Sequence, residues 1–438
     1  MQITVGLGLG STALTGPGAA PNMGLVKPQN LYTAAQADFS ETAHINLRGN
    51  WTVAQGDLQQ ITGNGSMNDV RMDLDTPIVA GHPHIALWQA VPGTTGTYRS
   101  QYGGDGSLSG VTLSGDDLRP KFHWTPAGDI TGNYTRYGWN PTHDALDLQI
   151  TDVALYDLAT VDPNTVACDV VLCLGDSNMG NAVSDLVTDA NLTTAFDPRV
   201  WYMPSLRMSP YAFNNTYSLR HVPQPCIEPV QASSGAARMS PLQAFGAQFA
   251  PYATERGRPV LLLSLGDAGA GLNGSEDWRK SSGVAVTGGR MYGEMLAMVA
   301  ALQALGPAHQ IVGAIVSIGA NDTTGADYNT VWVPQATQFV ADLRAEPSLN
   351  NANLPIVWLT PGSHYEPISG EDRGARMIAA IETLDQDSGS AQAITGLKSV
   401  RPPNGNQLTP GDASDPHFNA TGMQANGTVM ADMLRGML

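Results

Sequence analysis

Basic residues are scarce in this chain. Its 438 residues include 22 lysines and arginines against 39 acidic residues, so the net charge is −17. A surface of this sign repels phosphate backbones and anionic lipid headgroups, which argues against nucleic acids and membrane surfaces as partners. Long apolar runs are missing as well, since no uninterrupted stretch approaches the roughly 20 residues that a membrane-spanning helix needs. We therefore expect no membrane insertion.

Cysteine is also rare, with three in the chain. Their number is odd, and Cys168 and Cys173 lie in an apolar run that is typical of a buried strand. Together with Cys226, they are predicted to be free, buried thiols. The cysteines are not spaced as closely as the ligand pairs of a metal site, so we expect no metal there.

The first twenty residues contain no lysine or arginine and no sustained apolar core. This pattern argues against a signal peptide. Two locations fit such a chain: the cytoplasm, or a phage particle, whose components meet the outside world without an export signal. Residues 1–35 are rich in Gly, Ala and Pro, as in an arm or linker. An arm that becomes ordered must pack against something, which favours a homo-oligomer or a virion assembly.

Residues 36–160 show the two-residue period of β-strands. Leu146, Leu148 and Ile150 alternate with polar residues, and Val153 continues the pattern after a one-residue break that predicts a bulge. Gly- and Pro-containing turn signals separate further short strands. Since no helical period intervenes, this region is predicted to be an antiparallel β-sandwich.

Two segments of the predicted sandwich, residues 49–63 and 146–158, resemble the jelly-roll carbohydrate-binding modules that often accompany glycan-active enzymes. The resemblance implies that the sandwich binds carbohydrate. Exposed aromatic side chains would stack on sugar rings, although a place in the core is the commoner arrangement for any single one. The candidates are Trp51, Trp88, Tyr102 and Trp139.

From residue 166 to 438, strands and helices alternate. Four near-continuous apolar runs are typical of parallel strands buried on both faces. These runs are residues 170–174, 260–263, 315–318 and 356–359. Helical periodicity appears over residues 291–305 and 335–345. We therefore predict a doubly wound parallel sheet in an α/β domain, with its active groups at the carboxyl ends of the strands.

A candidate nucleophile follows the first of these strands, in the motif Gly175-Asp176-Ser177. The glycine permits a sharp turn, which places the serine at the end of the strand. There the serine's own N–H can face a developing oxyanion. Taken alone, this tripeptide is a common turn, so its significance depends on the motifs that accompany it.

Candidate oxyanion donors follow the next two strands. Gly266, in the segment 264–269, can donate its backbone N–H without a side chain blocking the approach. Gly269 would take this place if the loop is shifted. Asn321, after the strand 315–318, can offer its side-chain amide; the alternative is an asparagine that caps a turn or a helix.

A candidate base lies near the C-terminus. A serine hydroxyl is a poor nucleophile until a base takes its proton. Of the nine histidines, His417 has both acidic neighbours and a position ahead of a helical tail, and His364 is the reserve candidate. Asp415 or Asp412 would orient the imidazole and stabilise its charge.

The motifs together resemble the SGNH, or GDSL-type, hydrolase superfamily. Its name lists the serine, glycine, asparagine and histidine found here as Ser177, Gly266, Asn321 and His417. Over residues 168–438 the chain is more narrowly similar to the sialate O-acetylesterase-like carbohydrate esterases. This narrower similarity rests on residues 177–179, 197–201, 342–344, 354–356 and 417–422.

Three positions differ from the narrower family. That family usually has glutamine before its serine, where this chain has Asp176, as broader GDSL enzymes do. Its third block usually reads Gln-Gly-Glu, where this chain has Gly-Ala-Asn-Asp. Its acid usually lies three residues before the histidine, at the position of Ser414. At this departure from the family pattern we favour Asp415, and leave open Asp412 or a Ser–His dyad helped by a backbone carbonyl.

The resemblance implies a serine esterase that removes O-acetyl groups from a polysaccharide or other glycan, without metal or cofactor. His417 would deprotonate Ser177, Ser177 would attack the ester carbonyl, and water would hydrolyse the acyl-enzyme. A phage spike or fibre component that deacetylates a host surface sugar fits the same features. The alternatives are a general esterase or lipase of the same fold, and a non-catalytic structural or receptor-binding virion protein.

Overall fold

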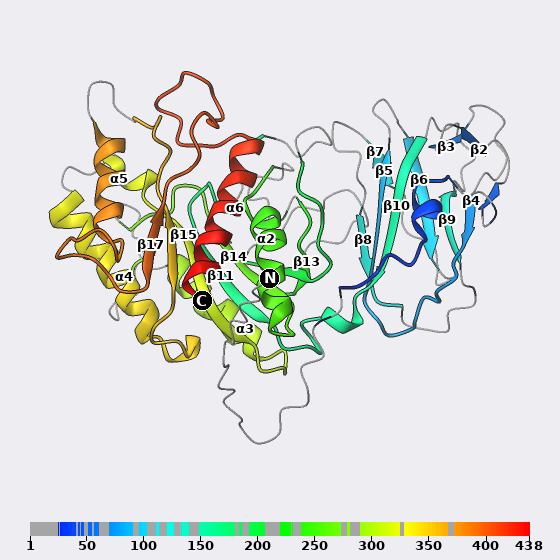
Figure 1. The fold of residues 1–438 in the computed structure, drawn as a ribbon, viewed down its shortest axis with the longest axis horizontal. Coiled ribbons are helices and arrows are strands. Elements are labelled where there is room, and N and C mark those ends of the chain that lie inside the picture. The colour runs from blue at the N-terminus through cyan, green and yellow to red at the C-terminus, as the bar shows by residue number, and fades with distance from the viewer. Residues whose placement is uncertain are drawn as a thin grey trace, which may run out of the picture.

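The chain folds into an all-β part and an α/β part, which lie side by side in Figure 1. The structure is a computed structural model. It describes residues 25, 27–40, 43, 45–47, 51–54, 57–60, 70–90, 96–102, 111–113, 121–126, 132, 134–139, 149–179, 184–185, 192–205, 220–228, 230, 238–272, 278–280, 290–324, 328–366 and 372–438.

The all-β part consists of two five-stranded antiparallel sheets, with the orders β1-β4-β9-β6-β7 and β2-β3-β10-β5-β8. Between Ile150 and Asp152 the pairing of β10 with β5 shifts register, which confirms the predicted bulge. Leu146 and Leu148 lie outside the described residues. The strands are β1 (Ile45–Leu47), β2 (Trp51–Ala54), β3 (Asp57–Gln60), β4 (Val70–Asp73), β5 (His84–Ala90), β6 (Gly96–Tyr102), β7 (Val111–Leu113), β8 (Lys121–Trp124), β9 (Tyr134–Trp139) and β10 (Gln149–Asp157).

The described part of the predicted N-terminal arm packs against these sheets. Asn30 forms an antiparallel bridge with Tyr156 of β10. Tyr32 is buried, and its hydroxyl lies 2.6 Å from Oγ1 of Thr135. The one-turn helix α1 (Ala34–Ala37) follows, a helix that the sequence pattern did not predict. Ordered packing on the sandwich therefore begins before residue 36.

Trp88 does not present its ring for sugar stacking. Its side chain is 2% exposed and belongs to the core of the sandwich, so the commoner arrangement holds for this residue. The side chains of the other three aromatic candidates, Trp51, Tyr102 and Trp139, lie outside the described residues.

The α/β part is built on a mostly parallel seven-stranded sheet with the order β13-β12-β14-β11-β15-β16-β17. Each pair is parallel except β12 with the edge strand β13. The four apolar runs each fall within a strand or extend one residue past its end. The strands are β11 (Asp169–Gly175), β12 (Val200–Pro204), β13 (Gln224–Pro225), β14 (Val260–Gly266), β15 (Gln310–Ser317), β16 (Ile356–Leu359) and β17 (Leu397–Val400).

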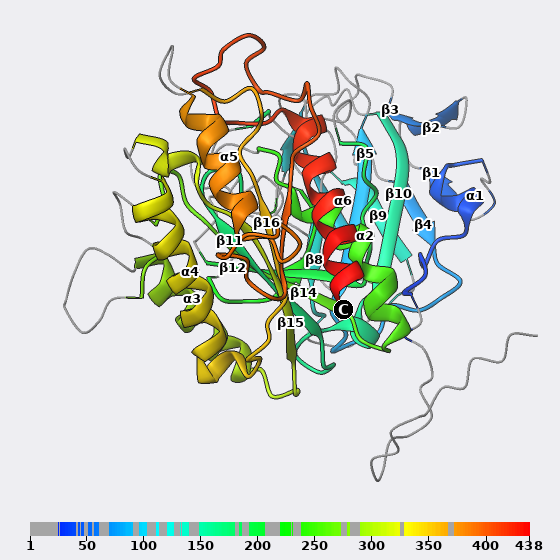
Figure 2. The ribbon, with the colours of Figure 1, turned by 60° about the vertical axis from the view of Figure 1, so that its left-hand side comes forward.

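Helices cover both faces of this sheet, with α3 and α4 on one side and α2 and α6 on the other in Figure 2. The two helices predicted from periodicity are α3 and α4. The α-helices are α2 (Leu242–Glu255), α3 (Arg290–Gln303), α4 (Val333–Ala345), α5 (Arg373–Thr383) and α6 (Ala420–Met437). Shorter turns are η1 (Ala159–Val161), η2 (Ala320–Thr324), the π-helical η3 (Tyr328–Trp332) and η4 (Pro347–Leu349).

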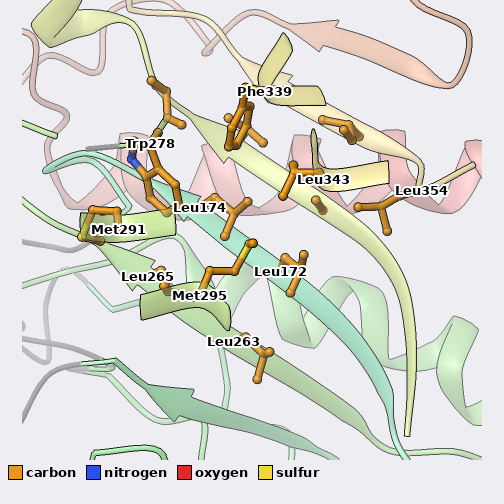
Figure 3. Close-up of a cluster of buried hydrophobic side chains, with 14 of the residues drawn as sticks. Leu172, Leu174, Leu263, Leu265, Trp278, Met291, Met295, Phe339, Leu343 and Leu354 are labelled. Atoms are coloured by element: carbon orange, nitrogen blue, oxygen red, sulfur yellow. The ribbon is translucent and has the colours of Figure 1, made fainter. Parts of the chain in front are cut away.

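Strand β11 is buried on both faces, which explains its continuous apolar sequence. Leu172 and Leu174 join the core on the side of α3 and α4, where Figure 3 shows them among the side chains of β14 and Phe339. Val171 and Cys173 join the core beneath α2 and α6. All three cysteines are free and buried, as predicted.

The order in which the chain builds the sheet reverses direction at β11. From β11 the chain moves outward to β12, returns through β14, and then crosses to β15 on the other side of β11. In open α/β sheets, ligands bind outside the carboxyl ends of the strands at such a reversal of direction. In the part of the chain that the structure describes, no helix is long and apolar enough to cross a membrane.

Candidate active site

Ser177 lies in a tight turn directly after β11. The N–H of Asp176 donates to the carbonyl of Ser317 on the neighbouring strand β15, at 2.9 Å. Asp176 then accepts two bonds within the turn, from the N–H of Asn178 to Oδ1 at 3.0 Å and from the N–H of Met179 to its carbonyl. These bonds hold Ser177, which is 5% exposed, at the carboxyl end of the strand.

The turn depends on the missing side chain of Gly175. A Cβ at this position would lie 2.5 Å from Cβ of Met179 and 2.8 Å from the carbonyl oxygen of Ser317. Both contacts are too short, and one of them is with backbone. An alanine must therefore displace either β15 or the turn that carries Ser177.

We expect Gly175→Ala to lower the free energy of unfolding by about 1–3 kcal/mol and to reduce ester hydrolysis, because overpacking here moves the serine. The matched control is Gly293→Ala in α3, where a Cβ meets nothing within 4 Å. That variant should gain up to about 1 kcal/mol of stability and keep its activity. Urea unfolding and initial hydrolysis rates test both; equal behaviour of the two variants would contradict the argument.

His417 lies next to Ser177 in the fold, although the two residues are 240 positions apart in the sequence. Its Nε2 lies 2.8 Å from Oγ of Ser177, and its Nδ1 lies 2.6 Å from Oδ1 of Asp415. Because a carboxylate can only accept, Nδ1 is the donor to Asp415, and in the neutral imidazole Nε2 is then the nitrogen that can accept the serine hydroxyl. The three side chains thus form one hydrogen-bonded chain.

Asp415 is held in place by bonds to both of its oxygens. Oδ1 also accepts the backbone N–H of His417 at 3.0 Å, and Oδ2 accepts the hydroxyl of Thr409 at 2.8 Å. Burial raises the pKa of Asp415, but the hydrogen bonds from Thr409 and His417 outweigh it, so the pKa lies below its ordinary value. The carboxylate is therefore ionised and able to stabilise a charged imidazole.

The two alternative residues take other partners. Asp412 accepts bonds from the N–H and the hydroxyl of Ser414. His364 lies 3.1 Å through Nε2 from the carbonyl oxygen of Asp415, and its ring meets the edge of Phe418. His364 therefore supports the segment that carries His417, and Asp415 is the carboxylate that the structure brings to the imidazole.

The predicted oxyanion donors come from the strands on either side of β11. Gly266 ends β14, is buried, and pairs in register with Gly175. Gly269 lies beyond the strand end, exposed, with a φ of +82°. Asn321 lies in η2 after β15, and its Nδ2 donates to the carbonyl of Ala270 at 3.4 Å. An amide nitrogen has two hydrogens, so this bond orients Asn321 and leaves one donor for a ligand.

Two buried acids lie near the serine. Asp176 is 1% exposed and Asp322 is 2% exposed. Burial raises the pKa of Asp176 to about 7, and the negative charge of Asp322 acts in the same direction, against the opposing bond from the N–H of Asn178. A carboxyl group that is largely neutral below pH 7 therefore directly precedes Ser177.

No role was predicted for Thr409 or Asp322. Asp322 directly follows Asn321 in the chain, and that adjacency was the available signal. Thr409 had no signal, because its contact with Asp415 depends on how the loop from 401 to 417 folds back on itself. Among the residues that the structure describes, no group of three or more His, Cys, Asp or Glu side chains is arranged to hold a metal ion.

No protein-family model matches this chain, and no curated protein matches it. Among solved structures it is similar to NanS, with 12% identity and a TM-score of 0.42 over 62% of this chain and 97% of that one. A protein from Arabidopsis thaliana is also similar, with 12% identity and a TM-score of 0.40 over 61% of this chain and 98% of that one. A family two carbohydrate esterase from Cellvibrio japonicus shows 17% identity and a TM-score of 0.33 over 90% of this chain and 95% of that one. With these scores below 0.5, the likenesses do not by themselves place the chain in a family.

Proposed function

We propose that this protein is a serine esterase that removes O-acetyl groups from a carbohydrate. The observation that carries the proposal is the hydrogen-bonded chain from Ser177 through His417 to Asp415. It stands at the carboxyl edge of the sheet, where ligands of this fold class bind. A serine hydroxyl within hydrogen-bonding distance of an oriented imidazole is the arrangement that acyl transfer requires.

In the first half of the reaction, Oγ of Ser177 attacks the ester carbonyl and its proton passes to Nε2 of His417. The imidazolium that results is stabilised by the ionised Asp415. The carbonyl oxygen becomes an oxyanion, for which the N–H of Ser177, the N–H of Gly266 and the amide of Asn321 are the proposed donors. Each such donor contributes about 10²–10³ in rate.

When the tetrahedral intermediate collapses, the ester bond to the sugar breaks and His417 gives its proton to the departing sugar oxygen, which leaves as a hydroxyl group. The acetyl group is then bound to Ser177 as an ester. Water enters, His417 takes one of its protons, and the remaining hydroxide attacks the acetyl carbonyl. When this second intermediate collapses, the bond between the acetyl carbon and Oγ breaks, His417 returns the proton to Oγ of Ser177, and acetic acid leaves and ionises to acetate. The cycle is complete without a cofactor.

The choice of an acetylated carbohydrate as substrate is supported by the motif resemblance to carbohydrate esterases and by the β-sandwich beside the α/β part. A polysaccharide could contact the sandwich while one of its acetyl esters enters the site. A virion component that deacetylates a host surface polysaccharide is one setting for this activity. A general esterase and a non-catalytic binding protein are the alternatives to be tested.

Acyl chain length distinguishes these possibilities. We expect p-nitrophenyl acetate to be hydrolysed with a kcat/KM at least about 100-fold above that of the octanoate, because an acetyl site excludes the longer chain. An O-acetylated polysaccharide such as acetylxylan should release acetate, measured by an enzyme-coupled assay. The Ser177→Ala variant is the control for spontaneous hydrolysis. Preference for the octanoate would favour a lipase, and no hydrolysis of any ester would overturn the proposal.

A further inference from the structure

Three fully buried tryptophans each donate an indole N–H to a segment that borders the site. Nε1 of Trp278 donates to the carbonyl of Gly175 at 3.3 Å, two residues before Ser177. Nε1 of Trp358 donates to the carbonyl of Ile318 at 2.8 Å, three residues before Asn321. Nε1 of Trp332 donates to Oδ2 of Asp322 at 2.9 Å. We call these three side chains the tryptophan layer.

The rings of the tryptophan layer pack in one continuous row, which the ring of Phe339 completes between Trp278 and Trp358. Trp278 meets Phe339 edge-on, with ring centroids 6.0 Å apart, and Phe339 meets Trp358 in the same way at 6.0 Å. Trp358 in turn meets Trp332 edge-on at 5.5 Å. Figure 3 shows Trp278 and Phe339 beside the leucines of β11 and β14. A row of interlocked aromatic rings in a close-packed core can move little, so the three N–H groups have fixed positions.

Asp322 extends this layer to the loop after β14. Its Oδ2 accepts the N–H of Leu272 at 3.0 Å in addition to the indole of Trp332. The neighbouring Asn321 donates to the carbonyl of Ala270 in the same loop. Two adjacent residues of η2 thus bind two positions of the loop that follows Gly266. Hydrogen bonds of the tryptophan layer, Asn321 and Asp322 therefore reach every segment that carries a proposed oxyanion donor.

We propose that the tryptophan layer and Asp322 act as positioning residues, which set the distances between Ser177 and the oxyanion donors. The inference rests on the proposed esterase function. Its physical basis is that a preorganised donor stabilises the transition state only where the oxyanion forms, and that a displacement of about 1 Å costs about 100-fold in rate. None of these side chains is proposed to touch the substrate.

The test replaces each donor while keeping an aromatic ring, in Trp278→Phe, Trp332→Phe and Trp358→Phe. We expect kcat on p-nitrophenyl acetate to fall about tenfold in each, and about 100-fold in Asp322→Leu, with KM changing less than about threefold. Asp322→Asn keeps an oxygen for both donors and should fall between wild type and Asp322→Leu. The affinity for an alkylboronic acid, which forms a tetrahedral adduct on the serine, should fall in parallel with kcat when measured by calorimetry.

The matched control is Trp201→Phe. Trp201 in β12 is equally buried, and its indole nitrogen has no hydrogen-bond partner among the described residues. That variant should lose stability but keep kcat within about twofold. If the layer variants also lose only stability, with wild-type kcat and boronate affinity, the inference is overturned and the esterase function stands. A wild-type protein that neither hydrolyses esters nor binds the boronate overturns both.

Discussion

Replacing Ser177 with alanine is expected to lower kcat for acetyl esters about 10⁶-fold while leaving the fold unchanged. The variant removes the oxygen that attacks the carbonyl, and the 2.8 Å bond to His417 disappears with it. The serine is small, and its turn is held by hydrogen bonds of Asp176, Asn178 and Met179 rather than by its hydroxyl. Initial rates of acetate release, together with circular dichroism and a urea unfolding curve, measure both parts of this expectation.

The same reasoning predicts that losses at Ser177 and His417 do not add. Because the two side chains act as one unit, the single variants and the double variant Ser177→Ala/His417→Ala should have nearly equal residual rates. His364→Ala is the matched control. It removes a histidine that contacts the carbonyl of Asp415, and it should cost no more than about tenfold. A His364 variant as inactive as the His417 variant would contradict the assignment of the base.

The strands of the α/β part were predictable because a strand that is buried on both faces has a run of consecutive apolar residues. Residues 170–174 of β11 are apolar without a break, since a strand between two layers of helices has no face that water reaches. The position of Ser177 follows from the strand end, because β11 stops where the glycine turn begins. The same holds for Asn321 after β15. These features depend on residues within about ten positions of each other, so a local pattern suffices.

The tertiary details were not predictable in this way. Asp415 and Asp412 are both near His417 in sequence, and only the path of the loop decides which carboxylate reaches Nδ1. The tryptophan layer joins residues that lie far apart in the sequence. Trp278 donates to the carbonyl of Gly175, which is 103 positions earlier in the chain, and the ring of Phe339 packs between Trp278 and Trp358. Nothing in the sequence around a buried tryptophan tells which oxygen its N–H will meet.

Asp176 should make the stability of the protein depend on pH in an unusual direction. Its pKa is raised from 3.8 to about 7 in the folded chain, mainly by burial. Between these values the native state holds a proton that the unfolded chain has lost, so the free energy of unfolding falls as the pH rises. The stability that comes from the proton on Asp176 is fully present below pH 3.8 and is lost as the pH rises toward 7. A difference of about three pH units corresponds to about 4 kcal/mol.

The variant Asp176→Asn should remove this dependence, because its amide resembles the neutral acid and cannot ionise. We expect the variant and the wild type to be similarly stable at pH 4, and the variant to be more stable by up to about 4 kcal/mol at pH 8. Urea unfolding at intervals from pH 4 to 8 gives the difference curve, in which titrations common to both proteins cancel. A flat difference curve for Asp176→Asn would show that this carboxyl group does not resist ionisation, and that the turn beside Ser177 tolerates a buried charge.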